Sequence, residues 1–158
     1  MTTKALIELC RNIASQAGVD QELAVAICGQ ESNYTASAVR YESSWAYFVD
    51  VDKYAKLLVI TYQTEIQLQK MSWGPMQVMG SVARELGYSG HLTELIIPQN
   101  GIFYGCEKLK QLCKKHKDQS DVIAAYNAGG AIKVNGRYRN QTYVEQVLKR
   151  IAMLKVVQ

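Results

Sequence analysis

The sequence has little proline and no long apolar run. Only two of its 158 residues are proline and 20% are charged, which is the composition of an ordinary folded domain and excludes a disordered or low-complexity chain. No run of about 18 apolar residues is present, which excludes a membrane-spanning helix. Glu8, Arg11 and Asn12 interrupt the apolar positions near the N-terminus, which a secretory signal peptide does not tolerate. We therefore expect a chain that is made in the cytoplasm and does not insert into membranes.

The four cysteines, at positions 10, 28, 106 and 113, lack the paired spacing of a metal site. They form no CxxC pair, which argues against zinc, and no metal ligand set is expected. Cys106 and Cys113 are placed in one predicted helix, where their Cα atoms lie about 10 Å apart, beyond disulfide reach. We expect all four to be small buried apolar residues in a reducing compartment.

Charge gives little information about function. The formal net charge is +4, and the only compact basic cluster is the KKHK sequence at 114–117. A mild basic excess suits a polyanion such as a cell-wall polymer or nucleic acid. Basic and aromatic residues do not alternate as in a nucleic-acid groove, so no nucleic-acid partner is expected.

Apolar spacing of three and four residues predicts a helical chain. The pattern gives an all-α fold in one domain over 1–158, with no internal repeat and room for a small irregular hairpin near a cleft. Predicted helices cover 3–17, a stretch capped by Asp20, 51–70, Pro75 to Gly87, a stretch from Pro98 to His116, 121–127, and a last helix from Thr142 with a capping box to Glu145.

One acid extends an apolar stripe. The second predicted helix carries Leu23, Ile27 and Cys28 on one face, and Glu31 lies four residues beyond Ile27 on that face. Desolvation there favours the neutral form of a carboxyl group and raises its pKa. A neutral carboxyl group can protonate the leaving oxygen of a glycosidic bond. Spacing alone, however, favours the simpler interpretation of a solvated or capping glutamate at a helix end.

Four segments together favour the catalytic interpretation. They are QESNY at 30–34, SWGPMQVM at 72–79, AAYNAGG at 124–130 and YV at 143–144. In this order, the chain resembles the catalytic domain of the soluble lytic transglycosylases, which are related to the goose-type lysozymes. The resemblance implies a lysozyme-like helical fold with a cleft for β-1,4-linked N-acetylmuramic acid and N-acetylglucosamine. It places Glu31 at the position of the single catalytic acid.

The resemblance also implies a reaction. The acid protonates the glycosidic oxygen, the 2-acetamido group stabilises the sugar carbon, and the same glutamate then takes the proton of the carbon-6 hydroxyl. A 1,6-anhydromuramic end results, and no cofactor is needed. Six further residues are expected to bind substrate, although Met79 fits core packing equally well and Ser32 fits a helix cap. They are Ser32, Gln77, Met79, Tyr126, Asn127 and Tyr143.

The chain departs from the family pattern in three places. An insertion at about 35–71 separates the acid from the SWGPMQVM segment, and within it RYE at 40–42 resembles a segment of phage-associated members. Glu42 is therefore a candidate second carboxylate of the cleft. Arg139 replaces an acid, and Pro75 replaces a leucine.

Two other functions stay open. A goose-lysozyme-type hydrolase needs a second carboxylate, for which Glu42, Asp50, Asp52 and Glu65 are candidates. A catalytically silent wall-binding or scaffold module is the other alternative. The expected partner in each case is peptidoglycan, bound by a monomer. An endolysin or virion-borne enzyme of a bacteriophage, or a secretion-machine enzyme, would reach the wall without its own leader.

Overall fold

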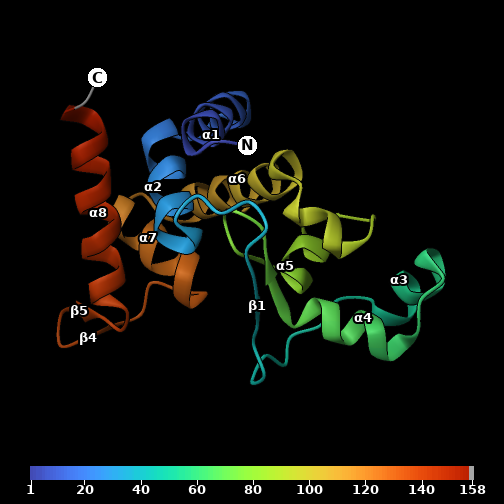
Figure 1. Cartoon of the computed structure of the whole chain (residues 1–158). Coiled ribbons are helices and arrows are strands. Elements are labelled where there is room, and N and C mark those ends of the chain that lie inside the picture. The colour runs from blue at the N-terminus through green and yellow to red at the C-terminus, as the bar shows by residue number, and fades with distance from the viewer. Residues whose placement is uncertain (157–158) are drawn as a thin grey trace.

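Helices dominate the computed structural model, which describes residues 1–156 (Figure 1). The all-α prediction is confirmed. The helices are α1 (Thr3–Ala17), α2 (Gln21–Ser32), α3 (Val51–Leu58), α4 (Tyr62–Gln69), α5 (Gly80–Glu85), the 3-10 helix η1 (Leu92–Ile96), α6 (Pro98–Lys115), α7 (Gln119–Ala128) and α8 (Gln141–Val156). The strands are β1 (Val39–Tyr41), β2 (Met71–Trp73), β3 (Val78–Met79), β4 (Lys133–Val134) and β5 (Arg137–Tyr138).

Helix α2 runs through the core. The Asp20 side chain caps its start by accepting a hydrogen bond from the Leu23 amide at 2.7 Å, as predicted. Every residue from Glu22 to Gly29 is buried, because α2 packs against α1, α6 and α8 (Figure 1). The core ends toward the C-terminus of α2, where Glu31 is only half-buried. The helix therefore carries this carboxyl group to the edge of the core.

Helices α6, α7 and α8 complete the core around α2. Residues 122–126 of α7 are all buried, and α7 packs against both α6 and α8. Gly129 ends α7 in the left-handed conformation, with φ 73°, as expected for a glycine stop. Three cysteines are buried as predicted, but Cys113 is exposed, so its prediction was wrong. Its position near the end of α6 carries it past the core.

A small antiparallel sheet replaces part of a predicted helix. Its strand order is β1-β2-β3, and Ser72 pairs with Met79. The helix predicted from Pro75 was wrong, because residues 74–77 form a turn and α5 begins only at Gly80. Gln77 has φ 49°, a left-handed conformation that a helix excludes. The chain therefore reverses before α5.

The helix predicted over 51–70 is also wrong. It divides into α3 and α4, which form a hairpin at the far side from α8 (Figure 1). The β-branched run at 59–61 disfavours helix continuation, and Val59 adopts φ 55°. Thr61 then caps α4 by accepting a hydrogen bond from the Thr64 amide at 3.0 Å.

The last helix begins one residue earlier than predicted. Thr142 lies inside the first turn of α8, and the side-chain amide of Gln141 donates to the Glu145 carboxylate at 3.0 Å. The loop before α8 holds a second hairpin, β4–β5, whereas the hairpin allowed for near the cleft corresponds to β2–β3. No helix within residues 1–156 has the length and apolar character to cross a membrane.

A buried ion pair attaches the α3–α4 hairpin to α5. Glu65 of α4 contacts Arg84 of α5 at 2.8 Å, and neither side chain is exposed. Arg84 also donates to the carbonyl groups of Tyr88 and Gly90, both at 2.8 Å. Gln69 donates to Glu65 at 2.9 Å. The pair is therefore fully hydrogen-bonded, the condition under which a buried charge is tolerated.

Removing one partner of this pair should destabilise the protein. We expect Glu65→Ala to lower the free energy of unfolding by about 3–5 kcal/mol, because it leaves the Arg84 charge buried and uncompensated. The double variant Glu65→Leu with Arg84→Met should recover a large part of that loss. Urea denaturation measures both, with Asp52→Ala as control, because Asp52 pairs with Lys56 at the surface. Equal losses in Glu65→Ala and Asp52→Ala would contradict the prediction.

Candidate active site

A cavity of about 300 Å³ lies where the C-terminal end of α2 meets the sheet, α5, α6 and α7. It contains both polar and apolar side chains, the composition of a small-ligand site. Its lining residues are Glu31, Arg40, Glu42, Ser44, Trp45, Ser72, Gln77, Met79, Val82, Lys108, Tyr126, Asn127, Ala128 and Gly129.

Glu31 enters this cavity as a half-buried carboxyl group. The Tyr143 hydroxyl of α8 donates a hydrogen bond to its Oε1 at 2.5 Å. Desolvation raises the pKa of Glu31, while the Tyr143 hydrogen bond and the charges of Lys108 and Arg40 lower it. The desolvation effect is the largest, so the pKa lies above that of a solvated glutamate. The protonated form therefore persists to higher pH than in an exposed glutamate.

Lys108 is a cleft residue that the sequence did not reveal. Its Nζ donates to the Tyr126 carbonyl oxygen at 2.8 Å and lies 4.0 Å from the centre of the Tyr126 ring. Burial lowers the pKa of Lys108 to about 8, and the charge of Glu31 opposes that shift. Helix α6 carries three other lysines, at positions 110, 114 and 115, and no local signal distinguishes Lys108 from them. Only the packing of α6 against α7 brings it to the cavity.

Two predicted site residues hold the turn at 74–77. The Ser32 hydroxyl donates to the Pro75 carbonyl oxygen at 2.7 Å, and the Tyr126 hydroxyl donates to the Met76 carbonyl oxygen at 2.8 Å. Ser32 does not line the cavity, whereas Tyr126 does. Burial raises the pKa of the Tyr126 hydroxyl well above its ordinary value, so it stays a donor. Both side chains thus position the turn beside the acid.

Gln77 lines the cavity, but its amide is engaged within the protein. Both hydrogens of its amide donate to backbone carbonyl oxygens, those of Ala38 at 3.0 Å and Gly74 at 2.9 Å. Its Oε1 accepts from the Ser72 hydroxyl at 2.8 Å. These three bonds fix the left-handed backbone of Gln77 and tie the turn to the start of β1. The Gln77 side chain therefore mainly determines the shape of the cavity wall.

Asn127 is the exposed amide of the cavity. Its Oδ1 accepts a hydrogen bond from the Asn140 side chain at 2.9 Å, and Asn140 also donates to the Ala124 carbonyl oxygen at 3.0 Å. Among residues 1–156 the amide hydrogens of Asn127 have no acceptor, so they can donate to a ligand. Asn140 escaped the sequence analysis because it lies in the loop before α8, outside the motifs that identified the other site residues. Met79 adds an apolar surface from β3 and is almost fully buried.

Of the four candidate second carboxylates, only Glu42 joins Glu31 in the cavity. Its Oε1 accepts from the Arg40 guanidinium group at 2.5 Å. The remaining three are ion-paired elsewhere: Asp50 with Lys53, Asp52 with Lys56, and Glu65 with Arg84. Over residues 1–156, no group of three or more His, Cys, Asp or Glu side chains is arranged to hold a metal ion.

The comparison with protein families bears on this geometry. The family model described as "Transglycosylase SLT domain" matches residues 8–147. The chain belongs to the transglycosylase SLT domain family. Enzymes of this family are lytic transglycosylases, which cleave peptidoglycan, and the helical fold of this SLT domain agrees with that membership. The search of the curated proteins and the search of the solved structures gave no match.

The contacts of Glu31 in this SLT domain predict how its pKa responds to substitution. Tyr143→Phe removes a hydrogen bond that stabilises the Glu31 carboxylate. Lys108→Met removes a positive charge that also stabilises this carboxylate. Each should raise the pKa of Glu31 further. A 13C NMR titration of the glutamate carboxyl carbons measures the shift. Tyr104→Phe is the control, because this half-buried tyrosine does not contact Glu31. The same Glu31 pKa in Tyr143→Phe and in Tyr104→Phe would contradict the prediction.

Proposed function

We propose that this SLT domain is a lytic transglycosylase in which Glu31 is the only catalytic carboxyl group. The observation that carries the proposal is the half-buried Glu31 carboxyl group, which lines the cavity and has a raised pKa. The only other carboxylate there, Glu42, is ion-paired with Arg40. The proposed substrate bond is the β-1,4 link from N-acetylmuramic acid to N-acetylglucosamine.

In the first step, Glu31 acts as the general acid. Its proton passes to the glycosidic oxygen as the bond from carbon 1 to that oxygen breaks, and N-acetylglucosamine leaves with a new hydroxyl group. The carbonyl oxygen of the substrate's own 2-acetamido group stabilises the positive charge on carbon 1. Tyr143 then stabilises the Glu31 carboxylate by its hydrogen bond.

In the second step, the Glu31 carboxylate acts as the general base. It takes the proton of the carbon-6 hydroxyl group, whose oxygen bonds to carbon 1 and displaces the acetamide oxygen. The product is a 1,6-anhydromuramic end, and Glu31 regains its proton. No water is consumed, so no second carboxylate is needed.

Neighbouring side chains suit an N-acetylated sugar. The free amide hydrogens of Asn127 can donate to an acetamide or hydroxyl oxygen, and Met79 offers an apolar contact for a methyl group. Ser32, Gln77 and Tyr126 support this surface by holding the turn at 74–77. Their proposed role is to position the wall of the cleft.

The position of Glu42 favours one competing function, a hydrolase. A second carboxylate in the cavity can activate water across the sugar. The two reactions leave different ends: a hydrolase leaves a reducing sugar with an oxygen from water, whereas a transglycosylase leaves an anhydro sugar. The ion pair of Glu42 with Arg40 supports the transglycosylase reaction, because the Arg40 guanidinium group engages the carboxylate that would have to activate water.

Glu31→Gln should abolish cleavage and leave binding intact. The amide keeps the shape of the side chain but has no acidic proton, so release of soluble muropeptides should fall by at least about 100-fold. Chromatography of digested peptidoglycan measures release, and sedimentation with insoluble peptidoglycan measures binding. Unchanged lysis would exclude the proposed role of Glu31. Loss of lysis and of binding together would point to a misfolded variant, which circular dichroism detects.

Digestion in 18O-labelled water distinguishes the two reactions. We expect anhydro ends without 18O in the products of both the wild-type protein and Glu42→Gln, because the nucleophile is the carbon-6 oxygen. Mass spectrometry of the muropeptides reads the label. Reducing ends carrying 18O, lost in Glu42→Gln, would establish the hydrolase instead.

A further inference from the structure

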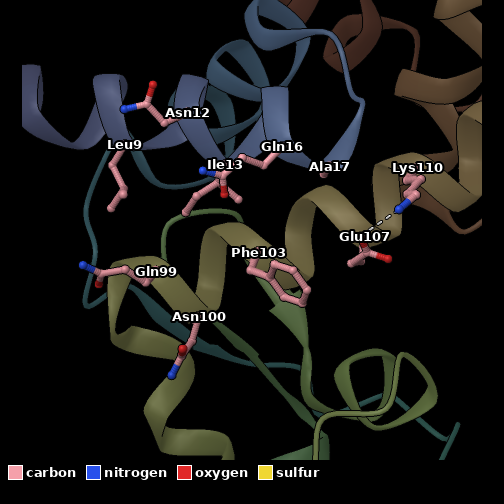
Figure 2. A pocket seen from close by; sticks show the side chains of 10 residues that line it. All are labelled: Leu9, Asn12, Ile13, Gln16, Ala17, Gln99, Asn100, Phe103, Glu107 and Lys110. Carbon is pink, nitrogen blue, oxygen red and sulfur yellow. Dashed lines mark hydrogen bonds and ion pairs between the residues drawn. The ribbon is translucent and has the colours of Figure 1, made fainter.

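A second and larger hollow lies on the other side of α6. It has a volume of about 770 Å³ and runs between α1 and α6 (Figure 2). Helix α1 contributes Leu9 and Ile13, whose side chains point toward α6, together with Gln16, and α6 contributes Phe103. We call this hollow the α1–α6 groove. It shares no lining residue with the catalytic cavity.

Three amide side chains of the groove have no partner. Within residues 1–156, the side chains of Asn12, Gln16 and Gln99 make no hydrogen bond to any other residue. A carboxamide offers two donors and an acceptor, so each can bind a hydroxyl or acetamide group. The groove is therefore rich in neutral hydrogen-bonding groups.

An exposed aromatic ring lines the same groove. The Phe103 side chain is 45% exposed, and Leu9 and Ile13 extend the apolar surface on α1. A flat ring suits the apolar face of a sugar. The only charges of the lining, Glu107 and Lys110, pair with each other at 3.3 Å, so the groove offers no free charge to an ionic ligand.

We propose that the α1–α6 groove binds a second stretch of glycan strand through its N-acetylated sugars. An aromatic ring and free amides in one groove match a sugar that carries both an apolar face and acetamide groups. A purely apolar partner would bury the amides without hydrogen bonds, which is unfavourable. The carboxylates of a peptide stem would find no free cation. The inference rests on the proposed function in one respect, which is that the same polymer fills both sites.

The groove would increase retention on the insoluble polymer. Helix α6 lines both sites, with Lys108 in the catalytic cavity and Glu107 in the groove. Two sites that bind one polymer raise its effective concentration at each of them. The groove therefore matters most on intact peptidoglycan and less on short oligosaccharides.

An NMR titration of the Glu31→Gln protein with a β-1,4-linked N-acetylglucosamine tetramer tests the site directly. We expect the side-chain amide signals of Gln16 and Gln99 to shift, in addition to that of Asn127 in the cavity. Shifts at Asn127 alone would overturn the groove and leave the proposed function standing. Shifts in the groove alone would support the groove and count against the proposed substrate of the cavity.

Retention on insoluble peptidoglycan gives a second test. In the Glu31→Gln background, Phe103→Ala should lower retention by about tenfold, whereas Phe103→Tyr should preserve it. Leu57→Ala is the matched control, because Leu57 is a 57% exposed apolar residue outside both sites. Equal retention of Phe103→Ala and Leu57→Ala would overturn the proposal. Failure of the Glu31→Gln protein itself to be retained would overturn both proposals.

Discussion

The proposed chemistry of this site depends on the desolvation of one carboxyl group. Glu31 lies at the end of a helix whose residues 22–29 are all buried, so the core holds its half-buried carboxyl group at the cavity edge. Burial disfavours the charged form, and the Tyr143 hydrogen bond opposes this effect without cancelling it. An acid in this balance can give up a proton and take one back. The proposed reaction asks for both steps from the same group.

The turn at 74–77 connects the acid to the rest of the cleft. Its carbonyl groups accept hydrogen bonds from Ser32 and Tyr126, and Gln77 ties it to Ala38. Ser32, Gln77 and Tyr126, which the sequence suggested as sugar ligands, thus donate their hydrogen bonds to backbone carbonyl groups of this turn. These contacts come from α2, α7 and the segment before β1, so three separate parts of the chain hold the wall of the cleft. Asn127 differs, since Asn140 orients it while its amide hydrogens stay free.

The sequence predicted those parts of the fold that local spacing controls. Helices α1, α2, α6 and α7 follow from apolar periodicity with capping residues such as Asp20 and stop signals such as Gly129. The strands and the break at Val59 did not follow, because they depend on left-handed backbone conformations and on pairing between distant segments. In the site, the family motifs located Glu31 and Asn127. Lys108 and Asn140 lacked any such signal, since only the packing of α6 and of the loop before α8 against α7 brings them near.

The most direct test of the account compares two titrations of the wild-type protein. One is the 13C NMR titration of the Glu31 carboxyl carbon, and the other is the pH dependence of kcat/KM for peptidoglycan cleavage. A general acid must be protonated in the free enzyme, so activity should fall as the pH rises through its pKa. The account predicts that the alkaline decline has the same midpoint as Glu31, above the value of about 4.3 for a solvated glutamate. A Glu31 midpoint at or below that value, or a decline that does not follow it, would contradict the account.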